Sequence, residues 1–136
     1  LAADPGSDPL GYLRKDAIHV LRMLSECERV QSVFEIKFCK LDGGPDFDRL
    51  RRAELETHGR CLSMLEVIFE AAVRRGQLPA HVDPKVTAEA MHAFIGGLMR
   101  SWVERHDFDL RAHAPWLVDT FLTGLRNAPV PEASVD

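Results

Sequence analysis

The chain has 136 residues, of which 46% are hydrophobic and 28% charged, with 21 acidic against 17 basic residues. This length and composition predict one soluble globular domain with a real core. The net charge of −4 argues against nucleic-acid binding by the chain itself, because such proteins usually present a basic face. No apolar run reaches the roughly 18 residues of a membrane span, and no signal peptide is visible. We therefore expect a cytoplasmic protein without membrane contact.

The first helix is predicted to start at Asp8-Pro9, because Asp accepts hydrogen bonds from free N–H groups and Pro fits the first helical position. Apolar spacing carries this helix to about Ser25. The run "SECE" at 25–28 then predicts a capping box, with Ser25 as the cap and Glu28 reaching back. A second helix follows and stops at "DGGPD", residues 42–46. Its apolar face comprises Val30, Val33, Phe34, Phe38 and Leu41.

The third helix is predicted over about 46–75, with Gly76 as a left-handed cap. Leu78 can then fold back onto the core. Asp83-Pro84 repeats the start signal and opens a fourth helix to about Arg105. A fifth helix covers about 110–127, in which Pro115 either kinks the helix or marks its true start. Residues 128–136 are expected to be a disordered tail.

Two polar residues interrupt the apolar stripe of the third helix, which runs from Phe47 through Leu50 to Ala72. They are Glu54 and His58, and burying either without a partner is costly. One interpretation is that they pair with each other or lie near the solvent-open end of the helix. The other is that they form the polar wall of a ligand site.

The fourth helix has two opposite faces. Met91, His92, Ile95, Leu98, Met99, Trp102 and Val103 form a broad apolar arc, with Gly96 and Arg100 at its edge. Nearly opposite lies a row of small residues: Ala90, Ala93, Gly97 and Ser101. Small residues let a second helix approach closely, so we expect this helix to pack on both sides.

The fifth helix offers Leu117, Val118, Phe121, Leu122, Gly124 and Leu125. The last two helices of two chains would make an isologous four-helix bundle, with Ala93, Gly97 and Ser101 in the same interface. The alternative is that all these residues form the core of a monomer.

Chemistry-bearing motifs are sparse. Cys27, Cys39 and Cys61 form no C-x-x-C pair, and a redox pair of Cys39 with Cys61 has no support in the pattern. Glu89-x-x-His92 has the ligand spacing of di-iron bundles, but such bundles need two of these motifs. We therefore expect no metal, no cofactor and no enzymatic activity, with a metal-binding bundle enzyme as the least favoured alternative.

Several segments resemble the C-terminal domain of TetR/AcrR-family transcriptional regulators. They are "AAVRRGQLP" (71–79), "AEAMHAFIGGLMRSW" (88–102), "FDL" and "WLVDTFL", in that order, and the likeness extends back to "DPLGYLRK" (8–15). It is greatest to the branch that represses multidrug efflux pumps. The resemblance implies a five-helix, all-α effector-binding and dimerisation domain over 8–127, after a connection remnant at 1–7. The family's helix-turn-helix domain is absent here, so we expect DNA binding only through that missing part.

The resemblance also implies a pocket for hydrophobic or aromatic effectors between the first four helices. Carried over by position, its lining comprises Ala17, Ile18, Leu21, Phe34, Phe38, Cys61, Met64, Leu65, Ile68, His92, Ile95, Gly96, Met99 and Arg100. Glu54 and His58 would join as polar groups. Arg100 matches a basic residue at the base of the family's cavity. Phe34, Phe38 and Gly96 stand where relatives can carry polar residues, which predicts a roomier and more apolar pocket.

The sequence thus predicts the ligand-sensing, homodimeric half of a repressor that controls an efflux-pump gene. The alternative is a dimerisation module without a ligand, which would explain the small-residue row but not the polar groups on the pocket-facing arcs.

Overall fold

The computed structural model describes residues 6–39 and 45–132, and all regular secondary structure in these two ranges is α-helical. Its elements are α1 (Pro9–Glu26), α2 (Glu28–Cys39), α3 (Pro45–Arg74), α4 (Pro84–Arg105) and α5 (Leu110–Arg126). The predicted all-α fold of five helices is confirmed. Leu41 and residues 42–44 of the predicted breaker lie outside the described residues.

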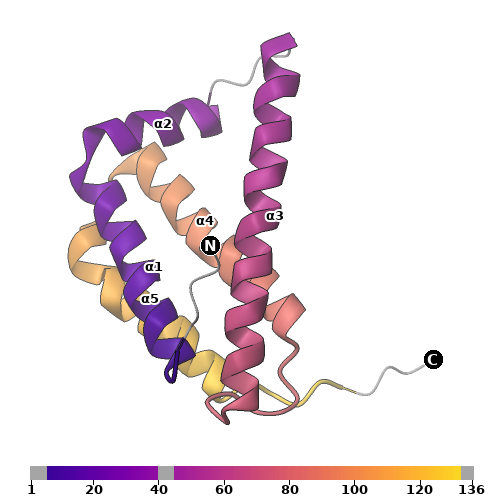
Figure 1. Cartoon of the computed structure of the whole chain (residues 1–136). Helices are drawn as coiled ribbons and strands as arrows, with labels where there is room; N and C mark the ends of the chain where they lie inside the picture. The colour runs from indigo at the N-terminus through magenta and orange to yellow at the C-terminus, as the bar shows by residue number, and fades with distance from the viewer. Residues whose placement is uncertain (1–5, 40–44, 133–136) are drawn as a thin grey trace.

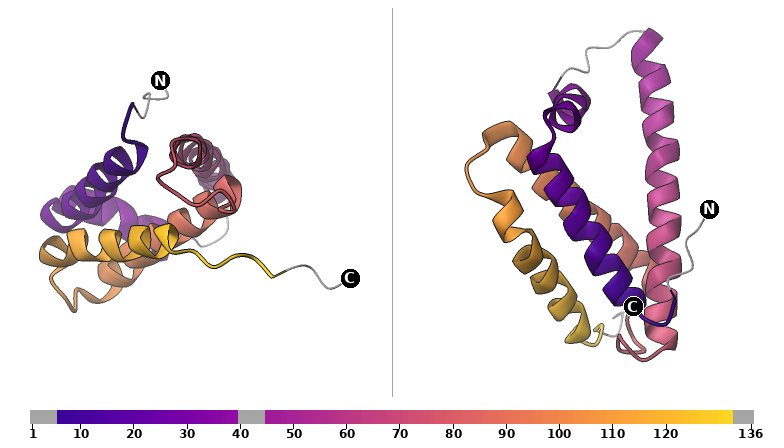
Figure 2. Two further views of the ribbon diagram at one scale, coloured as in Figure 1. Left: turned by 90° about the horizontal axis from the view of Figure 1, so that it is seen from below. Right: turned by 60° about the vertical axis from the view of Figure 1, so that its left-hand side comes forward.

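The helices pack in pairs around α1. α1 lies side by side with α5, α3 packs along α4, and α2 crosses one end of the bundle against α1 and α4 (Figure 1). α1 lies between α5 and α3 in the second view of Figure 2. The first half of α3 continues past the other helices at the end where α2 lies (Figure 1). No helix in the described ranges is long and apolar enough to cross a bilayer.

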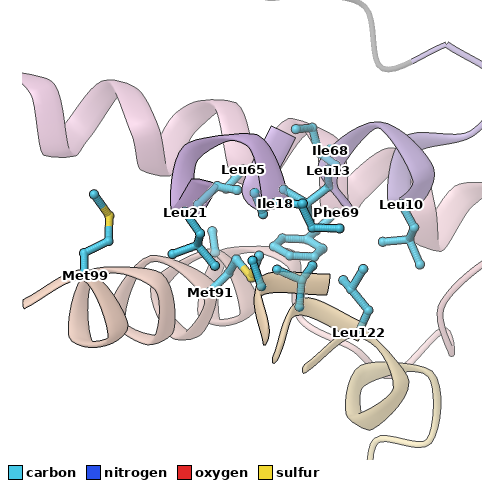
Figure 3. Close-up of a cluster of buried hydrophobic side chains, with 14 of the residues drawn as sticks. Leu10, Leu13, Ile18, Leu21, Leu65, Ile68, Phe69, Met91, Met99 and Leu122 are labelled. Carbon is cyan, nitrogen blue, oxygen red and sulfur yellow. The ribbon is translucent and has the colours of Figure 1, made fainter. Parts of the chain in front are cut away.

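The hydrophobic core draws on α1, the second half of α3, α4 and α5. Leu21 of α1 and Met91 of α4 point toward one another, and the ring of Phe69 lies among the other buried side chains (Figure 3). Phe69 and Leu21 are both fully buried. Removal of this apolar surface from water is the main stabilising term of the fold.

The start of α1 is tied to the end of α3 by one amide side chain. Asp8 caps α1 by accepting from the backbone N–H of Gly11 at 2.9 Å, and it also accepts from Nε2 of Gln77 at 2.7 Å. Gln77 Oε1 in turn accepts from the N–H of Leu10 at 3.0 Å. The hydrogen bonds from Gln77 and Gly11 lower the pKa of Asp8. Gly76, at φ +75°, makes the left-handed turn that was predicted.

Two further predictions about helix ends and loops are confirmed, and a third, the capping box after α1, is wrong. Asp83 caps α4 through Lys85 and Val86, and Leu78 folds back into the core. The capping box at 25–28 does not form, because Ser25 lies inside α1 and donates to its own helix, at Arg22 O. The junction is held from α2 instead: the Gln31 amide donates to the last carbonyls of α1, at Leu24 and Ser25.

Pro115 lies inside α5, which begins at Leu110 with Asp109 as its cap. Of the two alternatives for Pro115, the helix start is therefore excluded. A proline leaves the carbonyl four residues earlier, at Arg111, without its helical donor. Arg22 Nε of α1 approaches that oxygen at 3.5 Å, and Arg111 pairs with Glu26 at 2.6 Å. These contacts fasten the end of α1 to the start of α5.

The apolar stripes of α2 and α3 are only partly covered. Val33 is 59% exposed although Val30, Phe34 and Phe38 are half-buried, since neighbouring positions on a helix lie about 100° apart. Leu50 is 56% exposed because the first half of α3 runs past the bundle. Periodicity predicts the apolar side of each helix, and the structure leaves these two residues of that side open to solvent.

Candidate functional site

Side chains from three helices meet at the end of the bundle where α2 crosses. We call them the aromatic–polar cluster: Phe34, Lys37 and Phe38 of α2, Glu54 and His58 of α3, and His92 and Arg100 of α4. Six of the seven were predicted as ligand-binding residues. Lys37 is the one member that was not predicted.

Lys37 connects α2 to α3. Its Nζ lies 3.2 Å from Glu54 Oε1, and the two side chains are 39% and 41% exposed. The same ammonium lies 5.6 Å and 6.0 Å from the ring centroids of Phe34 and Phe38, whose rings are 5.6 Å apart. These distances are in the range of cation–π attraction. Glu54 therefore pairs with Lys37, not with His58 as one interpretation of the sequence had it.

His58 and His92 connect α3 to α4. Their ring centroids are 4.2 Å apart with the planes at 62°, and both residues are half-buried. Burial, together with the neighbouring His58 and Lys37, lowers the pKa of His92, while Glu89 opposes this shift. His92 is thus held neutral near physiological pH. A neutral imidazole can offer one donor and one acceptor to a ligand.

Arg100 of α4 lies at the surface of the cluster, near the ring of Phe38. Its guanidinium carbon lies 5.9 Å from the Phe38 ring centroid, and Nε pairs with Glu104 at 3.1 Å within the same helix. Its side chain is 61% exposed. Arg100 therefore stands at the solvent-facing rim of the cluster.

The other predicted ligand-binding residues fall into two groups. Six are buried in the hydrophobic core: Ala17, Ile18, Leu21, Leu65, Ile68 and Met99. Cys61, Met64, Ile95 and Gly96 are half-buried. A methyl group added at Gly96 would meet no atom within 4 Å, so there is open space beside this residue.

Lys37 had a signal in the sequence that was overlooked. It stands three residues after Phe34 and immediately before Phe38, on a helix with few basic residues. A long cationic side chain beside aromatic residues can lie over their rings while its head group stays near water. The ion pair between Lys37 and Glu54 could not be predicted from the sequence, because the two residues lie on different helices.

The residues predicted for the dimer face fall into two groups in the structure: some are accessible to solvent and some are buried in the core. On α4, Ala93 and Gly97 are exposed and Ser101 is half-buried; a methyl group at Gly97 would meet nothing within 4 Å. On α5, Leu117, Phe121 and Leu125 are half-buried and Gly124 is exposed. Val118 and Leu122 lie instead in the core of the single chain, 0% and 1% exposed. Any interface on α5 must therefore use the residues beside them.

The stack of Phe94 on Phe121, with centroids 5.0 Å apart, links α4 to α5 on this side of the molecule. Trp116 of α5 is 66% exposed. A large aromatic side chain so open to water is typical of a surface that meets a partner.

Metal and redox chemistry find little support. Within residues 6–39 and 45–132, no group of three or more His, Cys, Asp or Glu side chains is placed to hold a metal ion. Glu89, half of the di-iron-like motif, is exposed. Cys27 and Cys61 are free thiols, and the side chain of Cys39 lies outside the described residues, so the Cys39–Cys61 pair stays untested.

The chain matches a known protein family in sequence. Residues 8–127 match the C-terminal region of the MAATS-type transcriptional repressors, the TetR C-terminal family suggested by the sequence motifs. Because the match covers most of the chain, the chain belongs to this family of transcriptional regulators.

Several regulators are similar to the chain in sequence. The HTH-type transcriptional regulator TtgR of Pseudomonas putida is 34% identical over 123 residues, which are 90% of this chain and 59% of the relative. The HTH-type transcriptional repressor BepR of Brucella suis is 28% identical, over 88% of this chain and 57% of the relative. The regulator AcrR of Shigella flexneri is 33% identical, over 81% and 51%. The chain thus spans somewhat more than half the length of these relatives.

Proposed function

We propose that this chain is the effector-sensing and dimerising half of a TetR/AcrR-type repressor, and that the aromatic–polar cluster is where the effector binds. The observation that supports this most is the composition of the cluster. Two half-buried phenylalanines and two half-buried imidazoles from three helices combine apolar surface with a few polar groups. Sites for drug-sized aromatic molecules have this character.

Ligand binding at this place would act on the helices that form it. α2 is joined to α3 by Lys37–Glu54, α3 to α4 by the two histidines, and α2 to α4 by Arg100 over Phe38. A ligand that fits only one arrangement of these helices would favour that arrangement. The bland alternative is that the cluster only packs three helix ends together.

α4 would carry the effect to the partner subunit. Its His92 and Arg100 belong to the cluster, while its exposed Ala93 and Gly97 lie on the proposed dimer face. A shift of α4 would change how two subunits meet, and so the spacing of the DNA-reading domains of the intact regulator. Loss of operator binding would then release transcription. The resemblance to repressors of multidrug efflux leads us to propose an efflux-pump gene as the target.

Binding of a neutral aromatic probe, 2-naphthamide, tests the sensing role. Phe38→Ala should weaken its affinity about tenfold, because an aromatic contact and its buried apolar area are lost. Phe108→Ala is the matched control: it removes the same ring from the α4–α5 connection, where Phe108 contacts His113, and should leave the affinity unchanged. Isothermal titration calorimetry measures both.

A dimerisation module without a ligand remains the second candidate, favoured by the exposed row at Ala93 and Gly97. The same titration separates the two functions. If neither 2-naphthamide nor a panel of larger aromatic compounds binds the chain, the sensing role is rejected and only dimerisation is left.

A further inference from the structure

The ring of Phe38 is flanked by two cations that come from different helices. Lys37 Nζ of α2 lies 6.0 Å from its centroid, and the Arg100 guanidinium carbon of α4 lies 5.9 Å from it. Each cation has one carboxylate partner, Glu54 for Lys37 and Glu104 for Arg100. An aromatic surface beside two basic groups suits a ligand that is itself aromatic and acidic.

The two carboxylates are held differently. Glu104 is four residues from Arg100 on the same helix, so that pair is local. Glu54 reaches Lys37 across the space between α3 and α2, at 3.2 Å, with both side chains about two-fifths exposed. A partly solvated ion pair of this kind is weak, since water screens the attraction and two long side chains must be ordered. Glu54 can therefore return to water at little cost.

Lys37 also lies beside the aromatic rings of the cluster. Its ammonium lies within cation–π distance of both Phe34 and Phe38. Its charge contributes to the lowered pKa of His92 on α4, so the ammonium is felt on the far side of the cluster as well. The cation thus faces the same aromatic surface on which a ligand ring would lie.

We propose that Lys37 is a specificity-determining residue that binds the acidic group of an aromatic ligand in exchange for the Glu54 carboxylate. The inference rests on the proposed function, because it requires that aromatic ligands occupy the cluster. The ligand ring lies against Phe34 and Phe38, its carboxylate or phenolate accepts from Lys37 Nζ, and Glu54 turns into solvent. A charge-assisted hydrogen bond to the ligand replaces the Lys37–Glu54 ion pair. Neutral aromatic ligands leave the Lys37–Glu54 pair in place.

Two substitutions should act in opposite directions on an anionic probe. Lys37→Met removes the cation and should weaken 2-naphthoate binding about two- to fivefold, the range of one exposed ion pair. Glu54→Gln removes the competing carboxylate and should strengthen 2-naphthoate binding by a similar factor. Neither change should alter the affinity for the neutral amide, 2-naphthamide. Isothermal titration near neutral pH at low and high salt measures all of these affinities.

Matched controls come from the exposed ion pair of Arg60 and Glu56 on α3, at 3.8 Å. Arg60→Met and Glu56→Gln change the net charge by the same amounts without touching Lys37. They should leave the preference for naphthoate over naphthamide as it is in the unmodified chain. If they shift it as much as the cluster substitutions do, overall charge explains the effect and the inference is overturned.

The two substitutions and the two probes also separate failure of the exchange at Lys37 from failure of the sensing function. If Lys37→Met and Glu54→Gln move naphthoate affinity in the same direction or not at all, or change naphthamide affinity equally, the exchange does not occur. If naphthamide binds the unmodified chain but these results fail, only the inference about Lys37 is lost. If neither probe binds, the proposed sensing function falls with it.

Discussion

The pKa of His92 depends on the side chains that surround it in the cluster. Its half-buried ring lies against His58, it feels the positive charge of Lys37, and only Glu89 favours its protonation. Its pKa is therefore lower in the folded chain than the value of about 6.5 expected for an unfolded one. A ligand that donates a hydrogen bond to His92 would find the neutral ring.

A pH dependence of stability follows. Below about pH 6.5 the unfolded chain binds a proton at His92 more readily than the folded chain, so the free energy of unfolding falls with decreasing pH until the lower folded-state pKa is reached. We expect His92→Gln to lose less stability than the unmodified chain between about pH 7.5 and about pH 5.5. Urea unfolding followed by circular dichroism measures the difference.

His19→Gln serves as the control, since His19 is exposed on α1 and distant in sequence from the cluster. It should show the pH dependence of the unmodified chain. If His92→Gln and His19→Gln show the same dependence, the imidazole of His92 does not have the surroundings described above.

Helix ends were the most predictable elements of the fold. Asp8-Pro9, Asp83-Pro84 and Gly76 act as the sequence indicated, because capping depends on residues a few positions apart. The cap predicted at Ser25 is wrong although its local pattern allowed one. α1 continues through Ser25, and the Gln31 side chain donates to the carbonyl of Leu24 near the end of that helix. A local pattern therefore predicts a helix end only where no neighbouring side chain satisfies the same backbone groups in another way.

Helix faces were predicted less well. The periodicity of α2 and α3 identifies an apolar side, but not how much of that side a neighbour covers. Val33 and Leu50 are exposed for this reason. On α5, Val118 and Leu122 pack into the chain's own core, where the pattern equally allowed a second subunit. Only the spatial arrangement distinguishes these cases.

The small-residue face of α4 leads to a prediction about association. Gly97 is exposed and has space around it within the single chain. Gly97→Leu should not lower thermal stability of the fold, because leucine is the better helix former by close to 1 kcal/mol. If a partner helix approaches here, overpacking by about 1–3 kcal/mol should raise the dimer dissociation constant by roughly five- to 150-fold. Sedimentation equilibrium measures this constant.

Gly59→Leu is a matched control on α3, where the glycine is likewise exposed and has no atom within 4 Å of an added methyl group. It should leave association unchanged. A Gly97→Leu chain that dimerises as strongly as the Gly59→Leu chain would show that this face of α4 is not the interface.

At the scale of the whole molecule, the sequence predicted the fold and most members of the cluster, but not how they are connected. It identified Glu54, His58, His92 and Arg100 as polar groups on apolar faces. It could not show that Glu54 pairs with Lys37 or that the two imidazoles meet, because each of those contacts joins two different helices. Ion pairs and ring contacts between helices depend on the packing geometry, which periodicity does not define.

α4 contacts its neighbours through several residues along its length. His92 lies against His58 of α3, Arg100 lies over the Phe38 ring of α2, and Phe94 stacks on Phe121 of α5. The exposed Ala93 and Gly97 lie on the same helix. α1 and α5 are joined by Arg14 and Asp119, whose two hydrogen bonds are 2.5 Å and 2.9 Å long. The proposed effector site and the proposed dimer face therefore share one helix.

The most direct test of the central claim, that the cluster binds the effector, is a titration with 2-naphthamide followed in amide ¹H–¹⁵N spectra. We predict that the largest shifts occur in α2, around residues 54–61 of α3 and around 92–100 of α4, with residues 122–126 of α5 little changed. Saturable shifts confined to α5, or no shifts at all under conditions that saturate binding by calorimetry, would contradict the account.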